Sequence, residues 1–317
     1  MEPVPAARVG ASVDLGSNSV HLLVAAIEGH SLRPLVDESV FLGLGATIDA
    51  HGHLGSAGRV GLVEALRAYA ATARGLDAVA LTFMGTEPIR RAADGARIVA
   101  EVGAATGVPL HILSHEEEAY LTLVGVTDGR SVSAETLVVD IGGGSSEFCA
   151  VAPNGTARAA GLRLGSNRLS IRYARADPPA AADLAAMAAA ADAELAQALE
   201  SQPADLVIVG GTASNLLKVT PEGVADRTLD RARLAGALRV LTELSASALT
   251  KTFRVNPVRA RLLPAGAVIV QALMRRYGVD RVRVSEAGLR EGAILVADHA
   301  GRAWRDRLPS LAHGWRG

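Results

Sequence analysis

Two short glycine-bearing segments combine residue types that can bind anions and metal ions. They read SVDLGSNSVH at 12–21 and VVDIGGGSSE at 138–147, and Asp14 in the first aligns with Asp140, 126 residues later, in the second. The same offset also aligns Gly16 with Gly142 and Ser19 with Ser145. Because apolar residues lie on both sides of each segment, each predicts a strand, a tight turn and a second strand.

Such turns direct backbone N–H groups outward, where they bind phosphate oxygens with help from serine hydroxyls. Glycine allows positive φ and a close approach of the ligand. An aspartate at a strand end can orient a metal-bound water, and Mg²⁺ needs only one or two carboxylates. One such turn would fit an ordinary β-hairpin, but two matched copies favour phosphate binding. No GK[ST] occurs and each turn leads into a strand, which excludes the Walker A and Rossmann arrangements.

The predicted phosphate contacts are Ser17, Asn18 and Ser19 in the first turn, and Gly143, Gly144, Ser145 and Ser146 in the second. A third glycine turn, VGGTASNL at 209–216, opens a predicted helix. Because a helix N-terminus attracts anions, Gly211 and Thr212 are further candidates. The eight histidines are scattered without metal-ligand spacing, and we interpret them as structural or surface residues.

The segment LSHEEEAYLTLVGV at 113–126 offers a candidate general base. Ser114 and Glu117 have the spacing of a capping box, which assigns Glu117 to a helix N-terminus. Glu118 lies about 100° further round and shares its face with Leu121, so we expect it to point partly inward, where a carboxylate could deprotonate a water. The alternative is a solvated glutamate favoured by the helix dipole, as expected for Glu116.

Arg90, in GTEPIRRA at 85–92, follows a predicted strand and turn. A guanidinium there could bind a phosphoryl group through two hydrogen bonds. The alternative is an ordinary surface arginine, an interpretation that suits Arg91 better.

Composition limits the class of protein. A chain of 317 residues, 49% hydrophobic and 21% charged, predicts two globular domains. Aromatic residues reach only 3%, which argues against stacking on single-stranded nucleic acid. Cys149 is the one cysteine, which excludes an internal disulfide and suits the cytoplasm. No apolar run approaches the ~20 residues that span a bilayer, and the start lacks the pattern of a signal peptide.

The formal net charge of −1 conceals a basic segment at 251–290, where nine Lys and Arg residues stand against Asp280 and Glu286. One interpretation is a set of solvated helix faces, and the other is a surface that attracts a polyanion.

Hydrophobic patterning predicts two α/β domains, one in each half of the chain. The expected strands are 8–14, 20–27, 32–41, 78–84, 108–113, 136–141, 146–152, 156–162, 205–211 and 281–285. The expected helices are 58–74, 87–106, 115–127, 166–174, 180–200, one from Thr212, 229–247, 257–277 and 288–299. A polar stretch near 125–135 divides the chain into domains 1–127 and 128–317, with the last helix able to pack back on the first domain.

The order of these motifs resembles the exopolyphosphatase/guanosine pentaphosphate phosphohydrolase (Ppx/GppA) family of the actin-like ATPase superfamily, in its short two-domain form. The matching segments are DLGSNS at 14–19, T-x-x-x-R at 86–90, EEA-x-L at 117–121, DIGGGSSE at 140–147, LRLGSNRL at 162–169, GGTASNL at 210–216, LPAGAVI at 263–269 and SEAGLREG at 285–292.

The resemblance implies two ribonuclease H-like α/β domains with the active site in an interdomain cleft. It implies Mg²⁺-dependent release, with Mn²⁺ as the alternative metal, of terminal phosphate from inorganic polyphosphate or of the 5′ γ-phosphate from guanosine pentaphosphate. It maps the catalytic base to Glu118 and a phosphate contact to Arg90, and with the turn chemistry it assigns the metal to Asp14, Asp140 and Glu147. Guanosine tetraphosphate is a further expected ligand and a homodimer the expected assembly, with neither nucleic acid nor membrane as partner.

Two residues depart from the family pattern, Pro88 within the T-x-x-x-R segment and His115 in place of a glycine. The helical domains that follow in long family members are also not expected here, which weakens processive action on long chains. Two other functions stay open from the sequence. One is a sensor that binds polyphosphate or guanosine tetra- and pentaphosphate with little turnover, and the other is an ATP-dependent kinase of the same superfamily.

Overall fold

The chain folds into two compact units, which we describe separately. The computed structural model describes residues 8–29 and 31–315, apart from the side chains of 221–223. One unit comprises Met1–Ser131 and Leu289–Gly317, and the other comprises Val132–Gly288. No helix among the described residues has the length and hydropathy needed to cross a membrane.

The first unit is built on a five-stranded mixed sheet in the order β3-β2-β1-β4-β5. Strands β1, β2 and β3 pair antiparallel, and β4 and β5 run parallel to β1. The strands are β1 (Arg8–Leu15), β2 (Ser19–Glu28), β3 (Ser31–Phe41), β4 (Ala80–Gly85) and β5 (Leu110–Ile112). The helices are α1 (Leu44–His51), α2 (Gly55–Gly75), α3 (Glu87–Arg91), α4 (Gly95–Thr106), α5 (His115–Thr127), α14 (Leu289–Ala300), the 3₁₀ turn η1 (Gly301–Ala303) and α15 (Trp304–Leu311).

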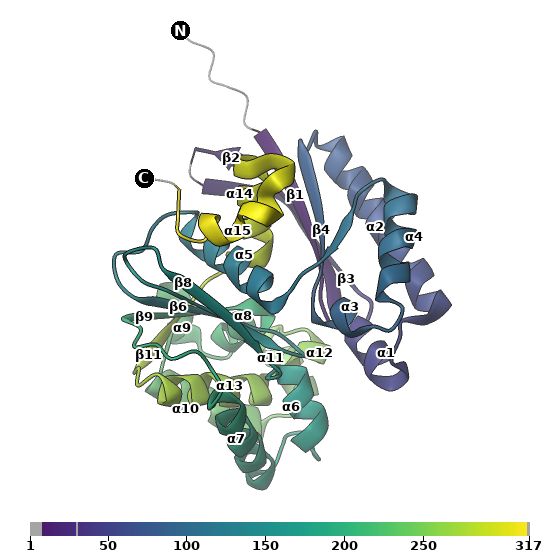
Figure 1. Cartoon of the computed structure of the whole chain (residues 1–317). Helices are drawn as coiled ribbons and strands as arrows, with labels where there is room; N and C mark the ends of the chain where they lie inside the picture. Colours follow the sequence, from purple (N-terminus) through teal and green to yellow (C-terminus); the bar gives the residue numbers. More distant parts are fainter. Residues whose placement is uncertain (1–7, 30, 316–317) are drawn as a thin grey trace. The chain divides into compact units, whose positions relative to one another are not determined.

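Helices cover both faces of this sheet (Figure 1), as the nearly continuous apolar sequence of β1 and β2 requires. On one face Val13 and Leu22 join a core with residues of α2 and α4, including Leu66 and Ile98. On the other face α14 contributes Ile294, which packs with alternate residues of β2. The sheet is therefore the middle layer of three.

The second unit repeats this plan with a six-stranded sheet in the order β10-β11-β9-β6-β7-β8. The strands are β6 (Thr136–Ile141), β7 (Ser146–Val151), β8 (Ala157–Leu162), β9 (Asp205–Val209), β10 (Thr228–Asp230) and β11 (Arg281–Val284). The helices are α6 (Ser166–Tyr173), α7 (Ala181–Leu195), α8 (Gly210–Lys218), α9 (Pro221–Asp226), α10 (Arg231–Glu243), α11 (Ala246–Phe253), α12 (Pro257–Ala260) and α13 (Leu263–Arg276). Without the edge strand β10, its strand order matches that of the first unit, so the predicted duplication is confirmed.

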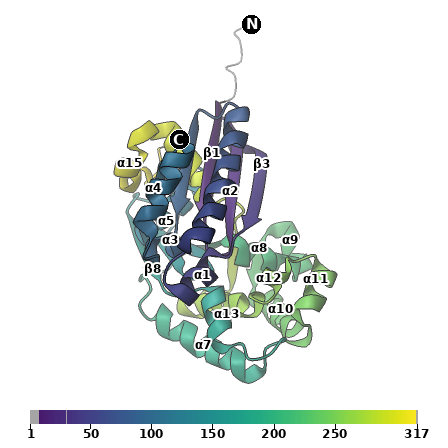
Figure 2. The same cartoon turned by 90° about the vertical axis from the view of Figure 1, so that its right-hand side faces the viewer.

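Three long predicted helices are shorter or interrupted. The helix expected at 87–106 divides into α3 and α4, because the Asp94 carboxylate accepts hydrogen bonds from the N–H groups of Leu54 and Gly55 and pairs with Arg59. These contacts bind the break to the start of α2, and α4 lies beside α2 (Figure 2). The expected helix 229–247 ends at Glu243 and α11 restarts at an N-cap, Ser245. The helix expected at 257–277 similarly divides before Pro264.

Residues 289–315 belong to the first unit, so the division 128–317 is wrong for them, whereas the expected packing of the last helix on the first domain is confirmed. Leu289, Ala293 and Leu295 of α14 and Trp304 of α15 form one buried cluster with Leu121 of α5. This apolar surface of α14 is buried only when the helix returns to the first sheet. The chain thus leaves the first unit after Ser131 and re-enters it at Leu289.

The contact between α14 and α5 depends on Gly292. A Cβ at this position would collide with the carbonyl oxygen of Leu121 and lie 3.0 Å from the backbone nitrogen of Gly125. We expect Gly292→Ala to lower the free energy of unfolding by about 1–3 kcal/mol, because two helix backbones must separate. Urea denaturation measures this. Gly103→Ala in α4, where an added Cβ meets nothing within 4 Å, is the matched control and should stabilise the protein slightly. Equal effects of the two changes would contradict the close approach.

Candidate active site

The first glycine turn joins β1 to β2 and is held from behind by backbone hydrogen bonds. The Gly16 N–H donates to the Ser19 carbonyl at 3.1 Å. The Asn18 carbonyl accepts from the N–H groups of Leu42 and Gly43, and the Ser17 carbonyl accepts from Gly45. In a trans peptide the C=O and the following N–H point in opposite directions. The N–H groups of Asn18 and Ser19 therefore point away from residues 42–45.

The second turn, between β6 and β7, has the same closing bond, from the Gly142 N–H to the Ser145 carbonyl at 3.0 Å. Its carbonyls face the start of α6. Gly142 O accepts from the Ser166 N–H, Gly143 O from those of Asn167 and Arg168, and Gly144 O from Arg168 Nε. By the same peptide geometry, the N–H groups of Gly143, Gly144 and Ser145 point away from α6. Three successive outward N–H groups suit the oxygens of a phosphate.

The serine hydroxyls of the second turn are less available than the sequence suggested. Ser146 is fully buried and its hydroxyl donates to the Leu164 carbonyl at 2.6 Å. Ser145 is buried as well. A phosphate contact from these two residues would therefore depend chiefly on the backbone of the turn.

Asp140 and Glu147 are direct cross-strand partners on β6 and β7. Their side chains therefore leave the sheet on the same face, with Cβ atoms about 5 Å apart. The corresponding pair in the first unit is Asp14 and His21. The two turns thus differ at one equivalent position, where the second carries an additional carboxylate.

The third glycine turn lies against Asp140. Gly210 has φ +96°, and a Cβ there would lie 2.7 Å from Asp140 Oδ1. Because only glycine fits this position without strain, β9 can end beside Asp140 and α8 can start there. Thr212 Oγ1 donates to Ser166 Oγ at 3.2 Å, which links the third turn to α6. The second unit therefore brings together Asp140, Glu147, the second turn, Gly211 and Thr212.

Among the described residues no three or more Asp, Glu, His or Cys side chains are grouped closely enough to bind a metal by themselves. Mg²⁺ usually keeps several waters and takes one or two carboxylates. The Asp140–Glu147 pair is a donor set of that kind, so these residues fit the predicted ion.

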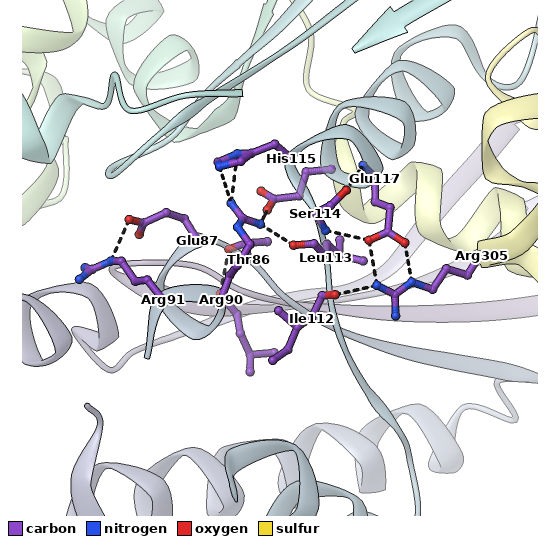
Figure 3. A network of polar contacts seen from close by, with 12 residues as sticks. Thr86, Glu87, Arg90, Arg91, Ile112, Leu113, Ser114, His115, Glu117 and Arg305 are labelled. Atoms are coloured by element: carbon purple, nitrogen blue, oxygen red, sulfur yellow. Dashed lines mark hydrogen bonds and ion pairs between the residues drawn. The ribbon is translucent and has the colours of Figure 1, made fainter. Parts of the chain in front are cut away.

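Glu118 pairs with Arg90, whose polar contacts with Leu113 and His115 are seen in Figure 3. Its side chain is 8% exposed and forms an ion pair with Arg90 Nη1, which also donates to the Leu113 carbonyl. Arg90 Nη2 lies 3.1 Å from His115 Nδ1. The inward position predicted for Glu118 is confirmed, and Arg90 is not an ordinary surface arginine, since its guanidinium contacts the candidate base directly.

The capping box predicted at the start of α5 is also confirmed. Ser114 Oγ accepts from the Glu117 N–H, and the Glu117 carboxylate accepts from the Ser114 N–H at 2.7 Å. The Glu117 carboxylate also accepts hydrogen bonds from Arg305 Nε at 2.5 Å and from Arg305 Nη2 at 2.9 Å. Arg305 lies on α15, 188 residues away, so the sequence offered no local sign of this contact.

Both departures from the family pattern fit this geometry. Pro88 occupies the first turn of α3, where a missing N–H breaks no helical hydrogen bond. His115 is the first residue of α5 and contacts the Arg90 guanidinium. The first change therefore only helps to start a helix, whereas the second alters the surroundings of Arg90.

Most of the basic segment 251–290 consists of paired side chains. Five of its nine cations are in ion pairs with acids outside the segment: Arg261 with Asp177, Arg275 with Asp192, Arg276 with Glu200, Arg283 with Asp205 and Arg290 with Asp37. The interpretation as ordinary helix and strand faces therefore suits the segment better than that of a polyanion surface.

Known structures share this architecture. The Ppx/GppA family member of Aquifex aeolicus superposes with a TM-score of 0.82 at 24% identity, over 93% of this chain and 99% of that one. An exopolyphosphatase from Cytophaga hutchinsonii superposes with a TM-score of 0.80 at 19% identity, over 90% and 96% of the two chains. The chain thus has the two-domain actin-like ATPase fold.

The family follows from the sequence comparisons. The model of the Ppx/GppA phosphatase family matches residues 23–299, and the chain belongs to this family. Exopolyphosphatase 1 of Mycobacterium tuberculosis is 30% identical over 296 residues, which cover 89% of this chain and 86% of that protein. Exopolyphosphatase 1 of Mycobacterium leprae is 29% identical over 297 residues. The resemblance predicted from the motifs is confirmed.

The contact between Glu117 and Arg305 makes stability depend on pH. Burial raises the pKa of Glu117, but hydrogen bonds from Arg305 and the Ser114 N–H outweigh it, so the pKa is lowered. A carboxyl pKa that is depressed in the folded state stabilises the fold at pH values above the ordinary carboxyl pKa. This stabilisation is lost as the pH falls through the pKa of the folded state. We expect Glu117→Gln to lower the urea midpoint near pH 7 and to weaken its decline between about pH 6 and about pH 3. Glu64→Gln on the exposed surface of α2 should leave the profile unchanged, and a Glu117→Gln profile parallel to wild type would contradict the assignment.

Proposed function

We propose that the protein is a Mg²⁺-dependent phosphohydrolase that releases terminal phosphate from inorganic polyphosphate, and that it also removes the 5′ γ-phosphate of guanosine pentaphosphate. The observation that carries the proposal is the buried Glu118 carboxylate held by Arg90 within a family of phosphatases. The exopolyphosphatase names of its relatives support polyphosphate as substrate.

In this proposal the outward N–H groups of Gly143, Gly144 and Ser145 bind phosphate oxygens. Hydrogen bonds fix the carbonyls of this turn before substrate arrives, so little reorganisation is needed during the reaction. Asp140 and Glu147 would hold Mg²⁺, or Mn²⁺, and the bound ion would neutralise charge on the phosphate oxygens. In the first turn, Ser17, Asn18 and Ser19 are proposed to bind phosphate, and Asp14 is proposed as a further carboxylate for the metal.

Glu118 is proposed to accept a proton from the attacking water. The water oxygen forms a bond to the terminal phosphorus while the bond from that phosphorus to the bridging oxygen breaks. The products are inorganic phosphate and a chain one phosphate shorter. Arg90 Nη1 donates both to Leu113 O and to the Glu118 carboxylate, and this contact supports the role of Glu118 as an oriented base.

Arg90 is proposed to contact the phosphate as well. Nη1 already donates to Leu113 O and pairs with Glu118. Nη2 would therefore donate to the phosphate oxygen, and this contact would replace the one with His115. A single guanidinium would then bind the base and the phosphate together, and His115 would occupy the phosphate side while the site is empty.

The cytoplasm is the proposed location and a homodimer the proposed assembly. Cys149 is buried and burial raises the pKa of its thiol to about 12, which suits an unreactive core residue.

A substrate panel tests the activity. Phosphate release is measured from short polyphosphate, long polyphosphate and guanosine pentaphosphate, with Mg²⁺, with Mn²⁺ and after chelation. We expect phosphate release without any acceptor and loss of this release on chelation. In Glu147→Gln, the metal concentration that gives half-maximal activity should rise about tenfold or more. A requirement for an acceptor would indicate a kinase. Thermal stabilisation by these ligands without phosphate release would indicate a sensor.

Substitution of the proposed base gives the sharpest test. Glu118→Ala should lower kcat by about 10²–10⁴-fold while phosphate-chain binding is largely retained, because the change removes proton transfer rather than binding. Thermal unfolding is measured in parallel, since the ion pair with Arg90 is also lost. Glu116→Ala, two residues earlier and exposed, is the matched control with unchanged kcat. A fully active, folded Glu118→Ala enzyme would exclude Glu118 as the base.

A further inference from the structure

Three connections of the first unit leave its sheet at the same edge. Strands β1, β4 and β5 run parallel, so their carboxyl ends meet at one edge, where ligands bind in open α/β sheets. The first turn follows β1, α3 with Arg90 follows β4, and α5 with His115 follows β5. Thr86 Oγ1 donates to the Leu15 carbonyl at 3.0 Å and so joins the first two connections. A phosphate bound at the first turn would therefore lie at the edge that carries Arg90 and His115.

The guanidinium of Arg90 has only part of its donors left for such a phosphate. Nη1 donates to the Leu113 carbonyl and to the Glu118 carboxylate, and both of these residues are buried. Since this nitrogen carries two N–H groups, both of its donors are engaged. A phosphate that takes two hydrogen bonds from Arg90 must therefore use Nη2, and Nη2 faces the His115 ring (Figure 3).

The His115 ring covers Nη2. The distances from Arg90 Nη2 are 3.1 Å to His115 Nδ1 and 3.2 Å to His115 Nε2. An atom in the ring plane at these two distances would collide with Cε1, the carbon between the nitrogens, so Nη2 lies over the face of the ring. Guanidinium groups are attracted to such faces. A phosphate oxygen and the His115 ring thus compete for the same nitrogen of Arg90.

The ring can leave Nη2 without a change in helix α5. The Glu118 N–H donates to the Ser114 carbonyl at 3.1 Å, and the capping box binds Ser114 to Glu117. His115 is the first residue of α5 and is only half-buried. Rotation about χ1 of His115 to another staggered position therefore uncovers Nη2, while the backbone that carries Glu118 stays in place.

We propose that His115 is a positioning residue that sets the affinity of the site for phosphate, because its ring occupies Arg90 Nη2 until a phosphate displaces it. This inference rests on the phosphate contact proposed for Arg90 and adds a competitor for that contact. Displacement lowers the apparent affinity for polyphosphate and for the inorganic phosphate product by the same factor. The ring has left before the chemical step, so it changes KM and not kcat.

His115→Ala tests the sign of this effect. We expect KM for polyphosphate and the inhibition constant of inorganic phosphate to fall together, by about threefold to tenfold, with kcat within about twofold of wild type. If His115 instead supported the position of Arg90, the same change would raise KM or lower kcat, and either result would overturn the proposal. His51→Ala, at the exposed end of α1, is the matched control and should leave all three constants unchanged.

His115→Phe tests whether the ring itself is the competitor. Phenylalanine keeps an aromatic face for the Arg90 guanidinium and removes the ring nitrogens. We expect KM and the inhibition constant in this variant to lie within about twofold of wild type. Values as low as those of His115→Ala would overturn the assignment of the ring face to Nη2.

Binding of inorganic phosphate in the presence of Mg²⁺ separates this inference from the proposed function, because this ligand undergoes no hydrolysis. Titration calorimetry should show about threefold to tenfold tighter binding in His115→Ala than in wild type. In wild type, the Cε1–H NMR signal of His115, identified by its loss in His115→Ala, should shift as phosphate is added. Equal or weaker binding in a folded His115→Ala protein, or an unshifted signal, would overturn the proposal. Tighter binding in a protein that releases no phosphate from polyphosphate would retain the role of His115 and reject the hydrolase.

Discussion

The direction of a few peptide groups is the constraint on which the candidate site depends. In both units a strand ends one residue after an aspartate, and the carbonyls of the next turn accept hydrogen bonds from donors behind them. Since a peptide unit is planar and trans, fixing each carbonyl also fixes the following N–H. The donors behind the second turn come from the first residues of α6, and those behind the first turn come from residues 42–45. The candidate anion-binding N–H groups are thus oriented by neighbouring segments rather than by the turn alone.

Once the turns are fixed, the two copies can differ in chemistry without differing in fold. The position opposite the strand-end aspartate is His21 in the first unit and Glu147 in the second. The closing hydrogen bond of the turn is the same in both. The two units therefore share the backbone geometry of this turn, while the second carries an additional carboxylate. That carboxylate is the reason why the proposed Mg²⁺ is assigned to the second unit.

The candidate base is positioned by contacts from far along the chain. Glu118 is bound by Arg90 of α3, and the adjacent Glu117 is bound by Arg305 of α15. Helix α14 approaches α5 so closely that Gly292 touches its backbone. Two segments from the end of the chain thus hold the helix that carries Glu118. The return of residues 289–315 to the first unit has a direct consequence for the geometry of the site.

Much of this protein was determined by local sequence. The duplicated strand–turn–strand unit, the capping box at Ser114 and the inward side of Glu118 follow from spacing and periodicity, because each depends on residues only a few positions apart. The order of the motifs also identified the family. Only the tertiary structure decided that Ser146 donates to a backbone carbonyl, that Arg305 binds Glu117, that α14 belongs with the first sheet, and that the His115 ring lies against Arg90. Each of these depends on segments distant in sequence, whose meeting is decided by the burial of apolar surface across the whole unit rather than by any local pattern.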